Sequence, residues 1–152
     1  MPPPSSNFTA IALLMFVSGM GIPLMATLNA GLGQHLASPV AASAVLFGVG
    51  FLCAGLMLLG IDFPARVSFV DAPWYLYLGA PFVLFYVLAV TWSAPRIGIG
   101  NAIFFVLLGQ LMAAAAIDHF GIFGALKTAI TPRRIAGICV MAVGVYLARK
   151  PR

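Results

Sequence analysis

The stretch Ile97–Ile117, IGIGNAIFFVLLGQLMAAAAI, decides the fold class of this chain. It contains 21 residues and no formal charge. As a helix rising about 1.5 Å per residue it would be about 31 Å long, enough to cross a hydrocarbon core of roughly 30 Å. Arg96 precedes it and Asp118 follows it, so charged residues mark both ends. Because an unpaired amide facing lipid costs several kcal/mol, we expect Gln110, well inside the stretch, to face protein or a wet cavity.

The composition of the whole chain agrees with a protein that crosses the membrane several times. Hydrophobic residues make up 62% of the 152 residues and charged residues 7%, with a mean hydropathy of +1.09. A net charge of +5 does not indicate nucleic-acid binding, because the basic residues lie at the ends of apolar stretches and form no basic face on a soluble domain. Anchoring to lipid headgroups explains their positions.

We predict an all-α membrane protein with a single domain of five transmembrane helices over residues 8–148. The expected spans are Phe8–Leu28, Pro39–Ile61, Pro73–Trp92, Ile97–Ile117 and Ile135–Ala148. Residues 1–7 are predicted to be a disordered Pro/Ser tail without the basic start of a signal peptide, and residues 149–152 a basic tail. The last span, at about 21 Å, needs the flanking turn from Thr131 and snorkelling of its basic neighbours.

The first span carries two features of interest. Gly19, Gly21 and Pro23 lie in its second half, where the missing backbone donor of proline predicts a kink or local unwinding that would serve as a hinge. At 100° per residue, Asn29 lies within about 20° of Ser18, so one face carries polar groups. These two residues either line a cavity, or Ser18 bonds its own backbone and Asn29 caps the helix. The span is predicted to end in a polar connection, Gly31–Ser38.

Catalytic and metal-binding patterns are missing from the spans. The sequence shows no paired acids, no Ser/His or Cys/His arrangement and no metal ligands at depth, so we expect neither an enzyme nor a cofactor. Cys53 and Cys139 are interpreted as small apolar residues. Asp118 and His119 are the only candidates for a proton-linked role, although local capping or hydration is the favoured interpretation because adjacent residues do not share a helix face.

The basic residues show no bias between the two sides of the membrane. With five spans, one side holds Arg66, Lys127, Arg133 and Arg134, and the other holds Arg96, Arg149, Lys150 and Arg152. The positive-inside rule therefore gives no preferred orientation. We expect a chain that inserts both ways round, or one paired with a homologous partner of opposite orientation, which builds an inverted repeat from separate chains.

Two segments resemble the YdcZ-like branch of the drug/metabolite transporter superfamily. They are GQLMAAAAIDHFGIFG, Gly109–Gly124, and LNAGLGQHLASPVAASAVLFGVG, Leu28–Gly50. The resemblance covers nearly the whole chain and implies a five-helix half-transporter of the bacterial inner membrane, pairing antiparallel into a ten-helix unit around a central pathway. One departure is Met25, near which the family often has a glutamine.

The final span, GICVMAVGV at Gly137–Val145, is similar to the G-L-x-L-I-x-x-G-V dimerisation motif of small multidrug resistance transporters. That similarity implies dimer contacts at Gly137, Met141 and Gly144. Small multidrug exporters resemble one another in a first-helix glutamate that binds proton and cation. This sequence has no Glu at all, and no Asp or His inside a predicted span, so antiport of a lipophilic cation is disfavoured.

These observations predict a secondary transporter or exporter for a small neutral or weakly charged metabolite. Its pathway would lie between two antiparallel protomers. The predicted substrate-pathway residues are Gln110, Ser18, Asn29, Tyr86 and Trp92. The bland interpretation of Trp92 is an interfacial aromatic belt. The alternative function is a non-transporting membrane assembly subunit, in which the polar groups hold helices together at about 0.6–2 kcal/mol each.

Overall fold

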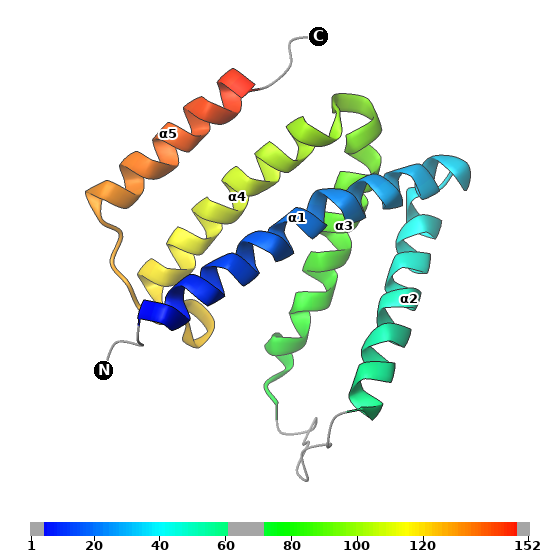
Figure 1. Ribbon diagram of the computed structural model, residues 1–152, viewed down its shortest axis with the longest axis horizontal. Helices are drawn as coiled ribbons and strands as arrows, with labels where there is room; N and C mark the ends of the chain where they lie inside the picture. The colour runs from blue at the N-terminus through cyan, green and yellow to red at the C-terminus, as the bar shows by residue number, and fades with distance from the viewer. Residues whose placement is uncertain (1–4, 61–71, 149–152) are drawn as a thin grey trace. The chain divides into compact units, whose positions relative to one another are not determined.

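The computed structural model describes residues 5–60 and 72–148, and it places them in helices and short connections (Figure 1). The α-helices are α1 (Ser5–His35), α2 (Pro39–Leu59), α3 (Gly79–Ile97), α4 (Ile99–Phe120) and α5 (Pro132–Ala148). Two 3₁₀ helices, η1 (Trp74–Leu78) and η2 (Ile122–Gly124), lie before α3 and after α4. This arrangement confirms the all-α fold class.

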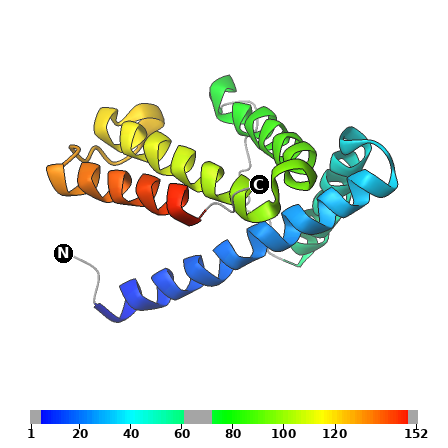
Figure 2. The same cartoon turned by 90° about the horizontal axis from the view of Figure 1, so that it is seen from above.

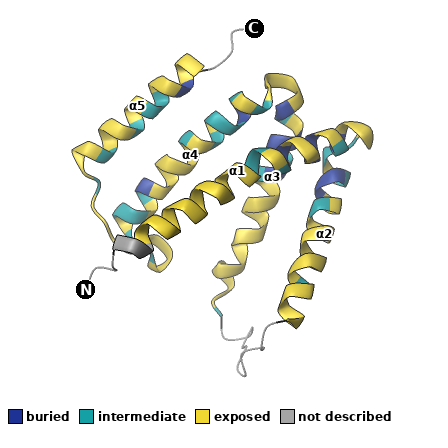
Figure 3. Cartoon of the chain, in the orientation of Figure 1, coloured by how far each residue is buried: buried dark blue, intermediate teal, exposed yellow. Residues whose placement is uncertain are grey.

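Four of the described helices are long and apolar enough to cross a membrane: Phe8–His35, Pro39–Leu59, Trp74–Ile97 and Ile99–Phe120. The fifth, α5, has 17 residues and a length of about 26 Å. Most residues along these helices are exposed (Figure 3), and many of them are large and apolar, including Phe51 at 77% and Leu59 at 85% exposure. Such surfaces fit a hydrocarbon environment and would be a liability in water.

The chain divides into two compact units, residues 1–96 and residues 97–152. In the first unit, α1 turns sharply into α2. Ala37 adopts a left-handed conformation at φ 50°, and the hydroxyl of Ser38 accepts a hydrogen bond from the Ala41 N–H at 3.1 Å. Ser38 thus caps α2, and Pro39 occupies the first helical position, where its missing N–H is not needed.

The core of the first unit is built from small residues, and it lies where the end of α1 meets the start of α2 and the last turns of α3. Gly33 marks the closest approach: a Cβ there would lie 3.0 Å from the Thr91 methyl group and 3.6 Å from the Cα of Pro39. The buried apolar side chains of this core are Ala26, Ala30, Ala42, Val87, Val90 and Ala94. Small residues let helices approach closely, and such close packing holds helices together in lipid, where the hydrophobic effect does not drive their association.

Two helices in the first unit run further than the sequence indicated. The first helix continues through Gly31–His35, the start of the predicted connection, so that Gly33 can meet the neighbouring helices. It also passes Pro23 without unwinding, although the proline cannot donate to the Gly19 carbonyl. The hydroxyl of Thr27 donates to the Pro23 carbonyl at 2.8 Å.

The predicted turn at Ser93–Arg96 is likewise helical. Pro95 lies in the last turn of α3, and the helix ends only at Ile97, just before Gly98, whose φ is +84°. A proline this close to the end of a helix removes only its own hydrogen bond, here to the Thr91 carbonyl, and leaves the rest of the turn intact.

In the second unit, α4 and α5 lie side by side and run in opposite directions (Figures 1 and 2). The fourth helix ends at Gly121, which has a φ of +65°. Such a left-handed residue is a common end of a helix. The fifth helix begins at Pro132, three residues before the expected Ile135, and the Thr131 carbonyl accepts from the Arg134 and Ile135 N–H groups.

Parts of the predicted layout lie outside the described residues. They are Met1–Pro4 of the N-terminal tail, Ile61 at the end of the second span, the loop charges Asp62, Arg66 and Asp71, and the basic tail 149–152. Ser5–Asn7, predicted as tail, already belong to α1.

Candidate functional site

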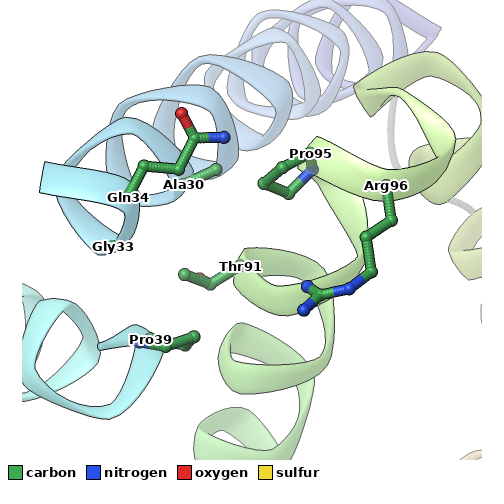
Figure 4. Close-up of a pocket in the computed structure, with 7 residues that line it drawn as sticks. All are labelled: Ala30, Gly33, Gln34, Pro39, Thr91, Pro95 and Arg96. Carbon is green, nitrogen blue, oxygen red and sulfur yellow. The ribbon is translucent and has the colours of Figure 1, made fainter. Parts of the chain in front are cut away.

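An open cleft of about 360 Å³ lies in the first unit, at the end where α1, α2 and α3 converge (Figure 4). The last turns of α1 and of α3 form its walls, and the first residue of α2 completes it. Gln34 and Arg96 bring an amide and a guanidinium group to this cleft. The lining residues are Ala30, Gly33, Gln34, Pro39, Thr91, Pro95 and Arg96.

A buried polar pair supports the inner wall of the cleft. The side-chain amide of Asn29 donates to the hydroxyl oxygen of Thr91 at 2.6 Å, and both residues are buried at 4% and 3% exposure. Thr91 itself lines the cleft, so Asn29 is one layer behind the surface. Asn29 therefore joins α1 to α3 and does not cap the first helix.

Arg96 is held in place by its own helix. Its guanidinium carbon lies 4.0 Å from the centre of the Trp92 ring, and Nη1 donates to the Trp92 carbonyl oxygen. Stacking on an aromatic face fixes the plane of the guanidinium group while leaving most of its N–H donors available. Trp92 thus acts as a platform for the cation of the cleft.

Trp92 also lines a second, apolar hollow of about 430 Å³ between α2 and α3. Its neighbours there are Pro39, Val40, Phe85, Leu88 and Ala89. The single indole therefore contacts a charged group and borders an apolar surface, an arrangement typical of an aromatic side chain near a membrane interface.

The other predicted pathway residues do not gather at the cleft. Ser18 is exposed in the middle of α1, and Gln110 is exposed on α4 in the second unit. Tyr86 is half-buried on α3, and its hydroxyl is shielded without a hydrogen-bond partner among the described residues. In the single chain, two of the predicted pathway residues adjoin the cleft. Asn29 bonds the lining residue Thr91, and Trp92 stacks with the lining residue Arg96.

The predicted hinge lies on an open part of α1. A Cβ built at Gly19 or at Gly21 would meet nothing within 4 Å. Pro23 cannot donate to the Gly19 carbonyl, so this turn lacks one helical hydrogen bond. The helix is nevertheless continuous here.

Two of the predicted dimer contacts line an apolar groove in the second unit. Met141 and Gly144 on α5 face Phe104 and Leu107 on α4 across about 210 Å³. Gly137 is exposed one turn earlier on the same helix.

Asp118 and His119 both tie the connection after α4 to that helix. The Asp118 carboxylate accepts from the Arg134 guanidinium at 2.7 Å, and its backbone carbonyl accepts from the Thr128 N–H at 2.8 Å. His119 Nδ1 accepts from the Ile130 N–H at 3.2 Å. These bonds give the two residues local structural partners. Within the ranges 5–60 and 72–148, no group of three or more His, Cys, Asp or Glu side chains is placed to hold a metal ion.

Sequence reasoning predicted none of the residues that line the cleft, and so it missed all three of its polar or charged side chains, Gln34, Thr91 and Arg96. Gln34 had been assigned to a connection and Arg96 to a boundary, although both lie in final helical turns. Thr91 gave the clearest signal, because with Val87 and Ala94 it forms a stripe of small side chains at helical spacing, with a single hydroxyl in it.

Comparison with known proteins identifies the family. The sequence model of the family described as "Putative inner membrane exporter, YdcZ" matches residues 10–147 of this chain. No match was found among curated proteins or among solved structures. The match begins in the second turn of α1 and ends in the last turn of α5. It agrees with the apolar helices, and it indicates a transporter rather than an enzyme. The chain therefore belongs to the YdcZ-like branch of the drug/metabolite transporters and is a multi-pass protein of the inner membrane.

Proposed function

We propose that this chain is one half of a secondary exporter for a small neutral or weakly charged metabolite. The observation that carries the proposal is the cleft of about 360 Å³, with Gln34 and Arg96 at its walls and the Asn29–Thr91 pair behind it. Its volume is at the lower end of the range found for small-molecule sites.

The charges of the described helices support the choice of cargo. In residues 5–60 and 72–148, Asp118 is the one acidic residue, and it is paired with Arg134 at the end of α4. A buried carboxylate is the usual way to bind a cation and couple it to protons in lipid. The described helices contain no such buried, unpaired carboxylate, which argues for a substrate without a strong positive charge.

The second half of the transporter would be another copy in the opposite orientation. The balance of basic residues supports this arrangement. In such a pair, Gln110 of each copy would lie near the membrane midplane and face a shared pathway, which would satisfy its amide. Ser18, Asn29 and Tyr86 would supply further hydrogen-bonding groups, and Trp92 an aromatic wall.

Alternating access would come from the two protomers exchanging shapes. The segment from Gly19 to Pro23 would be the hinge, because its glycines meet no neighbouring side chain and its proline leaves one carbonyl without a helical donor. Met141 and Gly144 would contribute to the dimer contact.

Flux measurements on two amides of α4 test the pathway. Proteoliposomes would be loaded with a small-molecule extract of the expression host, and the solutes released would be compared with those from protein-free liposomes. We expect Gln110→Ala to slow release of the transported solute about 3- to 10-fold, the effect of one lost hydrogen bond. Asn101→Ala is the matched control, because the Asn101 amide already donates to the Ile97 carbonyl at 2.8 Å.

The assembly-subunit alternative predicts a different result. Gln110→Ala would then lower stability while no solute would leave the wild-type liposomes faster than the protein-free ones. Release that is the same in wild type and Gln110→Ala would contradict the proposed pathway.

A further inference from the structure

Arg96 is an isolated cation in its surroundings. Residues 5–60 and 72–96, the described part of the first unit, contain no other formally charged residue and no carboxylate. Arg96 makes no ion pair with any residue in the described ranges. A guanidinium group stays protonated at every physiological pH, so the cleft carries a permanent positive charge.

The geometry prepares this cation for a ligand. One N–H is occupied by the Trp92 carbonyl and the group stacks on the Trp92 ring at 4.0 Å, which limits its motion. A guanidinium group has five N–H donors, so donors remain for a second partner. A planar guanidinium held in this way suits the two oxygens of a carboxylate or phosphate.

The cleft supplies a second polar group for the remainder of the ligand. Figure 4 shows Gln34 and Arg96 on different sides of the cleft, with Pro95 and Thr91 between them. The Gln34 amide can donate and accept, so it suits a hydroxyl, amino or carbonyl group next to the anion.

Helix-end electrostatics alone account for only part of this arrangement. A cation in the last turn of α3 complements the helix dipole, and a long side chain there can reach the headgroups. Those effects explain why a basic residue occurs at this position. They do not require the guanidinium to stack beside a cleft whose other wall carries an amide.

We propose that this cleft is an oxyanion-binding site, in which Arg96 binds the carboxylate or phosphate of its ligand and Gln34 binds a neighbouring polar group. Two sources share this chemistry: a small acidic solute, or the phosphate of a lipid headgroup. The first source rests on the proposed export function and narrows its substrate class to weakly acidic metabolites.

Trp92 fluorescence reports binding directly and needs no transport. The chain has two tryptophans, so Trp74→Phe leaves Trp92 as the only one. This variant would be purified in a phosphate-free maltoside detergent and titrated with sodium phosphate and with sodium acetate, against sodium chloride at matched ionic strength. A parallel titration would add phosphatidylglycerol to the micelles.

We expect a saturable change in Trp92 fluorescence. Arg96→Gln should lower the affinity for the anion at least about tenfold, the loss expected of a charge-assisted contact. Arg96→Lys keeps the charge but loses the planar fork, and we expect an intermediate affinity. Arg133→Gln is the matched control, since it removes an exposed arginine of the second unit and should leave binding unchanged. Circular dichroism would verify that every variant keeps its helical content.

Each outcome has one meaning. A response to phosphate or acetate supports the site with a soluble ligand, and a response to phosphatidylglycerol alone supports it with a lipid headgroup. No response to any of the three, or equal responses in wild type and Arg96→Gln, would overturn the site. That failure would leave solute release from proteoliposomes untouched, so it is distinguishable from a failure of the proposed export.

Discussion

Gly33 shows how a single side chain sets the packing of the first unit. Its position on α1 faces both α2 and α3, and its missing Cβ provides the room in which the Thr91 methyl group lies. Thr91 is fixed there by two constraints: a β-branched side chain has few rotamers, and its hydroxyl holds the Asn29 amide. One glycine thus sets the distance between helices that form the cleft.

Gly33→Ala should destabilise the protein by about 1–2 kcal/mol. Crowding against a rigid neighbour costs about 1–3 kcal/mol, and the better helix propensity of alanine returns at most about 1 kcal/mol. Gly31→Ala is the matched control, because a Cβ at that helical position meets nothing within 4 Å. It should leave stability unchanged or raise it. Denaturant unfolding in detergent micelles measures both, and equal effects of the two substitutions would contradict the packing described here.

The hydrogen bond from Asn29 to Thr91 gives a second prediction. Thr91→Val keeps the shape of the side chain but leaves a buried amide without its partner, so we expect a loss of about 1–2 kcal/mol. A double-mutant cycle with Asn29→Ala should give a coupling of about 0.5–1.5 kcal/mol. Ser43→Ala serves as the control, since the Ser43 hydroxyl donates to the Pro39 carbonyl of its own helix and has no other hydrogen-bond partner in residues 5–60 and 72–148. Strictly additive effects in the cycle would rule out the pair.

Individual residues were predictable where the pattern of a single helix identifies them. Helical spacing placed Asn29 on a polar face with Ser18, and the structure gives Asn29 a partner on another helix. Which helix would supply it was not predictable, because periodicity describes one helix at a time. Arg96 was interpreted from the sequence only as a span boundary, and its place in the site follows from the stacking on Trp92 and from the neighbouring cleft.

The connection between α4 and α5 is the clearest case of an element held by polar contacts. Asp118, His119 and Thr131 each bond a residue of the connection or the first turn of α5. Side chains at the end of α4 thereby fix where α5 begins. Such local partners account for Asp118 and His119 without requiring a role in proton transfer.

Removing this ion pair should have a small effect. The Asp118 and Arg134 side chains are about one third exposed, at 38% and 33%, so solvent screens their attraction. A double-mutant cycle of Asp118→Asn and Arg134→Gln should give a coupling of about 0.5–1 kcal/mol, which added salt would reduce. Arg133→Gln, next to the pair and exposed, should change stability by less than about 0.5 kcal/mol. Thermal unfolding at low and high salt checks these values, and a salt-independent coupling would be inconsistent with an ion pair.

Helix ends were the least predictable feature of the elements. Apolar runs marked the four long helices, but polar final turns such as Gly31–His35 and Ser93–Ile97 are helical because they pack or cap locally. Hydropathy identifies segments that are apolar enough for the hydrocarbon core, and these turns are too polar for it to assign them to a helix. Proline was also a weak indicator of a helix end, since Pro23 lies inside α1 and Pro95 inside α3.

For the whole molecule, the fold class followed from composition and from the apolar stretches, and the family from the resemblance of Leu28–Gly50 and Gly109–Gly124 to the YdcZ-like branch, whereas neither gave the orientation. Four basic residues on each predicted side give no topological preference. The proposed exporter depends on this balance, because two chains of opposite orientation would form the shared pathway at which Gln110 acquires a polar environment.

Orientation mapping of one cysteine tests this claim most directly. His35, exposed in the last turn of α1, would be replaced by cysteine in a Cys53→Ala, Cys139→Ala background and treated with a membrane-impermeant maleimide in intact cells. We predict that about half of the molecules react from outside and the remainder only after permeabilisation, because a chain without charge bias inserts both ways. Reaction of all molecules from one face alone would contradict the antiparallel transporter.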